Sequence, residues 1–176
     1  FKPLTFPYRS KKYNETREMG IKWLAEAKSK YNIPIITEVM EEKFLPLVCE
    51  VADIIQIGSR NMQNYPFLIA CAKTNKPLML KRHYGSSLRD WLGAAEYILK
   101  NGNKKLILCE RGVVAPHTHK ITSRFLIDLQ VVPAAQDITH LPIIVDPSHA
   151  TFWRPWVKSM ALASVASGAD GIMVEV

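Results

Sequence analysis

The sequence predicts an α/β fold built on a parallel sheet. Short apolar segments alternate with helical patterns along the chain, which is the order that produces parallel strands joined by helices. The apolar segments are nearly continuous rather than alternating in polarity, as strands buried on both faces are. No low-complexity stretch or Gly/Ser linker interrupts the series, and 176 residues suit one domain of ordinary size. We therefore expect a single domain.

Predicted strands are the segments rich in β-branched and other apolar residues. They cover residues 33–39, 53–57, 77–80, 105–109, 141–145 and 169–176.

The clearest predicted helix covers residues 88–99, where apolar side chains recur with helical spacing. Ser87 can cap its start and Gly102 follows its end. Pro46 and Pro155 are compatible with helices only near a helix start. The remaining predicted helices cover residues 16–30, 41–52, 61–73 and 156–167.

Two architectures fit this alternation: an open doubly wound sheet and a closed (β/α)8 barrel. No G-x-G-x-x-G or G-x-x-x-x-G-K-[ST] motif opens a helix, so the nucleotide-binding versions lose support. A barrel needs two more strands and typically about 250 residues. Because the chain starts at Phe1 without an initiator Met and stops at Val176 inside a predicted strand, we expect it to be a fragment, which keeps the barrel open.

Composition narrows the class of partner. Lys and Arg number 23 against 16 Asp and Glu, giving a net charge of +7 that suits anionic partners. The basic residues are dispersed and form no basic helix or aromatic-interleaved patch, which disfavours nucleic acid and leaves phosphorylated metabolites. No apolar run is long enough to span a membrane, and three scattered cysteines suit a reducing compartment. We expect a cytoplasmic protein that binds no membrane.

Polar or charged residues follow almost every predicted strand. The C-terminal ends of parallel strands gather on one face, so these side chains should share a pocket. Arg and Lys side chains brought together repel unless an anion joins them, and Arg suits phosphate. A His and carboxylates beside them can hold a divalent metal or transfer protons. The predicted pocket contains Glu38, Arg60, Lys81, Arg111, His149 and Glu175.

Seven motifs occur in one order along nearly the whole chain: FKPLTFPY, TEVM, QIGSRNMQNY, KPLMLKR, ILCERG, LPIIVDPSHAT and GADGIMVEV. Together they resemble 3-deoxy-D-arabino-heptulosonate 7-phosphate (DAHP) synthases of the type I beta class. The related 3-deoxy-D-manno-octulosonate 8-phosphate (KDO8P) synthases share the barrel and a CERG motif. DPSHAT and QIGSRNMQ look more like the DAHP enzymes.

This resemblance implies a (β/α)8 TIM barrel, of which residues 1–176 would form one catalytic domain lacking the first strand and the C-terminal end. It implies a transferase that condenses phosphoenolpyruvate with erythrose 4-phosphate to DAHP and phosphate. This reaction is the first step of the shikimate pathway to the aromatic amino acids. It also implies a divalent metal cation, with Mn, Fe, Co or Zn as candidates, and a cytoplasmic homo-oligomer.

Residue roles follow from the same resemblance. Catalysis is assigned to Glu38, Lys81 and His149. Metal binding is assigned to His149 and Glu175. Substrate binding is assigned to Lys2, Thr5, Ser59, Arg60, Lys81 and Arg111.

The chain departs from the family pattern at Leu4. The family has K-P-R-T where this chain has Lys2-Pro3-Leu4-Thr5, and leucine cannot donate a hydrogen bond to the aldose phosphate. A metal-binding Cys and Asp of the family also fall on segments outside this sequence. The alternatives are a KDO8P-type synthase using arabinose 5-phosphate and a non-catalytic homologue acting as a binding or regulatory subunit.

Overall fold

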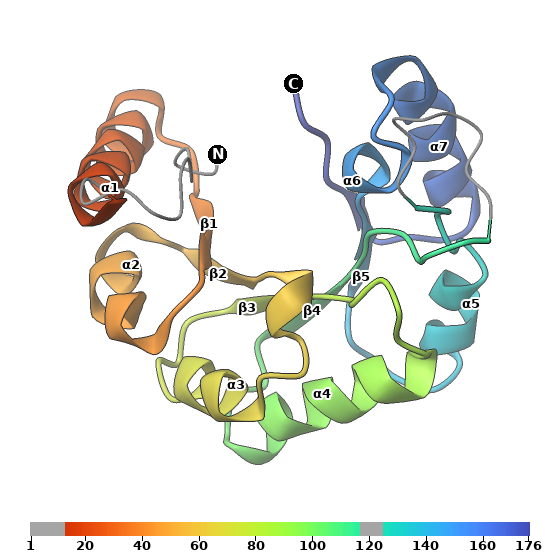
Figure 1. Ribbon diagram of the computed structural model, residues 1–176, viewed down its shortest axis with the longest axis horizontal. Helices are drawn as coiled ribbons and strands as arrows, with labels where there is room; N and C mark the ends of the chain where they lie inside the picture. Colours follow the sequence, from red (N-terminus) through yellow and green to blue (C-terminus); the bar gives the residue numbers. More distant parts are fainter. Residues whose placement is uncertain (1–12, 117–124) are drawn as a thin grey trace.

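The computed structural model describes residues 13–116 and 125–176, and its centre is one parallel sheet of six strands (Figure 1). Each strand pairs with the next strand along the chain, in the order β1-β2-β3-β4-β5-β6. The strands are β1 (Ile36–Val39), β2 (Ile54–Ile57), β3 (Leu78–Lys81), β4 (Leu106–Glu110), β5 (Ile143–Val145) and β6 (Gly171–Ile172).

The strand order distinguishes the barrel from the doubly wound sheet. A doubly wound sheet reverses its order at a switch point and carries helices on both faces. Here the order never reverses, and right-handed crossovers then place the connecting helices on the same face. Figure 1 shows the sheet curving with helices around its outside. This is the arrangement of a (β/α)8 barrel, of which the described strands form an open part.

Seven α-helices and two short 3₁₀ turns precede or connect the described strands. None of these helices is long and apolar enough to cross a bilayer. The helices are α1 (Tyr13–Tyr31), α2 (Leu45–Val51), α3 (Tyr65–Ala72), α4 (Leu88–Lys100), α5 (Val131–Gln136), α6 (Pro147–Thr151) and α7 (Arg154–Ala166), and the 3₁₀ turns are η1 (Glu42–Phe44) and η2 (Ser59–Asn61).

Prolines account for the main differences from the predicted helices. The helix predicted over 41–52 divides into η1 and α2, because Pro46 lies in the first turn of α2. The helix predicted from residue 61 starts at Tyr65, where Pro66 occupies the first turn and the Asn64 side chain accepts a hydrogen bond from the amide of Phe67. Helices α5 and α6 were not predicted, since five or six residues show too little periodicity.

Side-chain alternation along the strands separates two layers. Leu78, Leu80, Leu106 and Leu108 belong to the apolar core that packs against the helices. The alternate positions point to the inside of the curved sheet, and Lys81 occupies one of them beside Cys109 of β4. Burial raises the pKa of the Cys109 thiol to about 12, so this neighbour of Lys81 is a neutral packing group. The strand period therefore sends Lys81 into the interior.

Candidate active site

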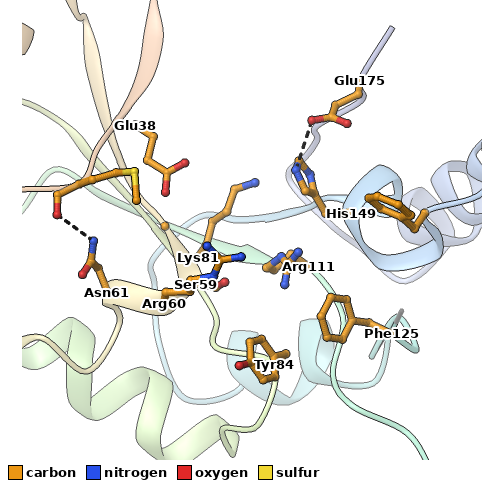
Figure 2. A pocket seen from close by; sticks show the side chains of 13 residues that line it. Glu38, Ser59, Arg60, Asn61, Lys81, Tyr84, Arg111, Phe125, His149 and Glu175 are labelled. Carbon is orange, nitrogen blue, oxygen red and sulfur yellow. Dashed lines mark hydrogen bonds and ion pairs between the residues drawn. The ribbon is translucent and has the colours of Figure 1, made fainter. Parts of the chain in front are cut away.

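A cleft at the C-terminal ends of the strands collects the residues that follow them. It encloses about 430 Å³. All six residues of the predicted pocket line it, together with Ser59. Each strand except β5 contributes a residue at or shortly after its C-terminal end. After β5, the contribution is His149, which lies on helix α6. Figure 2 shows Arg60, Lys81 and Arg111 reaching toward the same space. Lys2, Leu4 and Thr5 lie outside the described residues.

Lys81 is held by a buried ion pair with Asp146. The Lys81 Nζ atom lies 2.6 Å from Oδ2 of Asp146, and the two side chains are 4% and 0% exposed. Asp146 follows β5 directly, two strands away from Lys81, so the pair spans β4 inside the sheet. Burial alone would raise the pKa of Asp146. The His149 contact and the charge of Lys81 outweigh it and hold that pKa well below its usual value.

The two arginines enter the cleft from different supports. Arg111 follows β4 and is 7% exposed, with its guanidinium carbon 4.7 Å from the ring centre of Phe125. Arg60 is exposed and sits on η2, which begins directly after Gly58. Three cationic heads thus face one cavity from β3, β4 and the turn after β2. Arginine can bind phosphate with two parallel hydrogen bonds, so this side of the cleft suits a phosphorylated anion.

Glu38 faces the cationic side from β1. The carboxylate accepts a 3.4 Å hydrogen bond from the Gln56 side chain, its register partner on β2. The carboxylate also lies against Gly58, where an added Cβ would overlap Glu38 Oε1. Gly58 has ordinary extended dihedral angles, so this position needs glycine for space rather than for backbone conformation. The position of Glu38 therefore depends on the absence of a side chain at Gly58.

A second buried ion cluster supports the turn that carries Arg111. Arg82 contacts Glu110 at 3.1 Å and Asp128 at 2.7 Å, and two of its nitrogens donate to the carbonyl of Ser86. Glu110 in turn accepts a 2.6 Å hydrogen bond from the Gly112 amide. Arg82 directly follows the inward-pointing Lys81, and Glu110 directly follows the inward-pointing Cys109, so both point to the helix side. This cluster positions the Arg111 turn and lies outside the cleft.

His149 and Glu175 meet on the opposite side of the cleft. The Nε2 atom of His149 lies 3.2 Å from Oε1 of Glu175, the contact drawn in Figure 2. His149 sits on α6, whose start is capped by Asp146, since the Asp146 side chain accepts a 3.0 Å hydrogen bond from the His149 amide. The Nδ1 atom of His149 also lies 2.7 Å from Asp146 Oδ2, within ion-pair range although not aligned as a regular hydrogen bond.

The two side chains on this side, His149 and Glu175, are of the kinds that bind divalent metals. An imidazole nitrogen and a carboxylate oxygen are a common donor pair for transition metals. A carboxylate behind the other ring nitrogen, as Asp146 is, fixes the orientation of a metal-binding histidine. Within residues 13–116 and 125–176, no third His, Cys, Asp or Glu completes a cluster. The described residues therefore offer two donors, His149 and Glu175, that suit a metal.

Three residues that shape the site were given no separate role from the sequence: Asp146, Tyr84 and Phe125. Asp146 belongs to the motif LPIIVDPSHAT and does not line the cleft, but it contacts both Lys81 and His149. Tyr84 and Phe125 line the cleft, but neither belongs to a strand. The role of Asp146 could have been inferred from its position in DPSH, directly after a predicted strand. Phe125 had no such signal, because it enters the cleft only through the return of the chain after β4.

The family model described as the DAHP synthetase I family matches residues 14–176. The chain belongs to this family. It is 43% identical over its whole length to a phospho-2-dehydro-3-deoxyheptonate aldolase of Thermotoga maritima, and covers 50% of that protein. A 2-dehydro-3-deoxyphosphooctonate aldolase of Acinetobacter baylyi is 33% identical over 90% of the chain, which covers 57% of that relative.

Solved structures agree with this family membership. A truncated 3-deoxy-D-arabino-heptulosonate 7-phosphate synthase from Thermotoga maritima superimposes with a TM-score of 0.85 and 45% sequence identity. The match covers 90% of this chain and 59% of that structure. The chain thus spans about half the length of the curated relatives it matches. The six sequential parallel strands of this chain correspond to part of the barrel of the DAHP synthetase I family.

Replacing Gly58 by alanine should displace Glu38 without unfolding the protein. The overlapping atom is the end of a flexible side chain, so we expect a stability loss of about 1 kcal/mol, the low end for overpacking, together with a moved carboxylate. Gly93→Ala is the matched control, because a Cβ there meets nothing within 4 Å and alanine favours a helix interior by about 0.5–1 kcal/mol. Denaturant unfolding and a crystal structure of each variant measure both effects. An unmoved Glu38 in Gly58→Ala would contradict this account.

Proposed function

We propose that this chain forms part of the catalytic barrel of a transferase that condenses phosphoenolpyruvate with erythrose 4-phosphate, producing DAHP and phosphate. The observation that carries the proposal is the convergence of Arg60, Lys81 and Arg111 on one cleft in a member of the DAHP synthetase I family. The Thermotoga relative, at 43% identity, is named phospho-2-dehydro-3-deoxyheptonate aldolase.

Phosphoenolpyruvate carries two anionic groups, and the cleft offers matching cations. In this proposal Arg60 and Arg111 bind the phosphate, since guanidinium groups pair with phosphate oxygens at low reorganisation cost. Lys81, fixed by Asp146, meets the carboxylate next to the reacting carbon. Ser59, on the same 3₁₀ turn as Arg60, adds a hydroxyl to the cleft wall. Lys2 and Thr5 are proposed to complete the phosphoenolpyruvate and aldose-phosphate contacts, respectively.

The chemistry requires one carbon–carbon bond, one water addition and one phosphate departure. The enol carbon of phosphoenolpyruvate attacks the aldehyde carbon of the sugar, leaving a cationic carbon that still bears the phosphate ester. Water adds to that carbon, and one of its protons goes to the alkoxide formed from the aldehyde. The tetrahedral intermediate then expels phosphate, which takes the second proton as the ketone forms. In this proposal Glu38 orients the water or accepts its proton, and the cationic side of the cleft stabilises the anionic groups by preorganised charge.

His149 and Glu175 would hold the divalent cation that the family implies. When bound, such an ion supplies Lewis acidity toward the aldehyde oxygen. Within this chain, Asp146 orients the imidazole of His149 and keeps Nε2 directed toward Glu175. The candidate metals are Mn, Fe, Co and Zn. We further propose one catalytic domain over residues 1–176, a homo-oligomeric assembly and a cytoplasmic location.

The first test of the proposal is substrate dependence. The full-length protein should release phosphate from phosphoenolpyruvate only with an aldose phosphate and a divalent metal, and should prefer erythrose 4-phosphate to arabinose 5-phosphate. Steady-state kcat/KM with each sugar measures this preference. Since a 33% identical relative bears the name of an octulosonate enzyme, a preference for arabinose 5-phosphate would move the protein to that branch. Absence of turnover with both sugars would favour a non-catalytic subunit.

The second test concerns the metal ligands. His149→Ala should lower the affinity of the full-length protein for Mn²⁺ by at least tenfold, because one of few protein ligands is lost. His140→Ala is the matched control, since His140 is exposed and lies outside the cleft. Titration calorimetry gives the affinity and stoichiometry of each variant. Unchanged values in His149→Ala would remove His149 from the metal site.

A further inference from the structure

Arg111 is buried against an aromatic ring as well as facing the cleft. Its guanidinium carbon lies 4.7 Å from the centre of the Phe125 ring, and only 7% of the residue is exposed. A guanidinium over an aromatic face is attracted by the ring quadrupole, and the attraction grows when water is excluded. The ring therefore limits the positions available to a long and otherwise adaptable side chain.

Phe125 is itself supported by a row of rings from the loop after β3. Tyr84 stacks on Phe125 with ring centres 5.3 Å apart, and His83 lies 4.1 Å from Tyr84. The carbonyl of Tyr84 accepts a 2.8 Å hydrogen bond from the Val114 amide. Figure 2 shows Tyr84 and Phe125 on one side of the cleft, with Phe125 next to Arg111. The aromatic row thus joins the loop after β3 to the cation after β4.

The backbone holds Phe125 beside the Arg111 turn. Val113 and Leu126 form an antiparallel bridge with two hydrogen bonds of 2.8 and 2.9 Å. Gly112, with φ at +94°, lets the two segments approach: a Cβ there would lie 2.7 Å from the Phe125 Cβ. Residues 111–113 and 125–126 are therefore held together by backbone contacts next to the contact between Arg111 and the Phe125 ring. The backbone thus holds Phe125 beside Arg111 independently of the contact between the two side chains.

We propose that Phe125, backed by Tyr84, is a positioning residue that fixes the Arg111 guanidinium for binding the phosphate of phosphoenolpyruvate. The inference rests on the proposed function for the identity of the anion. In this role Phe125 acts on the substrate through Arg111. Fixing the guanidinium before binding reduces the ordering cost of anion capture, so the effect belongs to substrate affinity rather than to the chemical step.

The test compares Phe125→Leu and Phe125→Tyr in the full-length protein. Phe125→Leu keeps an apolar side chain but removes the ring face, so KM for phosphoenolpyruvate should rise roughly 3- to 30-fold with kcat within about twofold of wild type. Phe125→Tyr restores the ring and should restore KM. Tyr97→Leu is the matched control: it removes one ring of the exposed Tyr65–Tyr97 stack outside the cleft, and should leave KM unchanged.

A second readout does not depend on turnover. An arginine-selective dicarbonyl reagent, followed by peptide mass spectrometry, reports the accessibility of Arg111. Labelling of Arg111 should be about threefold faster or more in Phe125→Leu than in wild type and in Tyr97→Leu. If the wild-type protein showed no turnover, the proposed function would be overturned. The labelling rates would still test whether Phe125 positions Arg111. Labelling of Arg111 in Phe125→Leu at the wild-type rate, or a KM equal to that of Tyr97→Leu, would overturn the role of Phe125.

Discussion

The buried ion pair between Lys81 and Asp146 is the interaction on which the rest of the cleft depends. Removing two charges from water is costly, and the cost is offset only by close geometry and further hydrogen bonds. The 2.6 Å contact and the nearly complete burial of both side chains meet the first condition. Asp146 meets the second by capping α6 through the His149 amide. One carboxylate therefore fixes the cationic side of the cleft and also the helix that carries His149.

Because Asp146 contacts both Lys81 and His149, the two sides of the cleft can differ in charge although they lie close together. The cationic side, from β3, β4 and η2, suits the phosphate and carboxylate of an anionic substrate. The other side joins an imidazole to a carboxylate, which suits a cation. Asp146 lies between them, and its negative charge separates Lys81 from His149. The pKa of Asp146 is held low, so the carboxylate keeps this charge across the neutral range.

Much of the fold could be predicted from the sequence because apolar strands and amphipathic helices have distinct periods. The choice of barrel needed the strand order, which the residues alone do not give. The cleft could be predicted from the rule that parallel strands present their C-terminal ends on one face. Adjacent basic residues were harder to separate: Lys81 and Arg82 both follow the strand predicted over residues 77–80, yet only Lys81 points inward. Phe125 could not be predicted, since its contact with Arg111 depends on a bridge between distant segments.

The central claim is that Arg60, Lys81 and Arg111 form a single anion site. A crystal structure of the full-length protein with phosphoenolpyruvate tests it most directly. The account predicts a phosphate held between Arg60 and Arg111, with the carboxylate of the same molecule at Lys81 and the Lys81–Asp146 pair intact. A phosphoenolpyruvate molecule bound away from these three side chains, or one that contacts only exposed Arg60, would contradict the account.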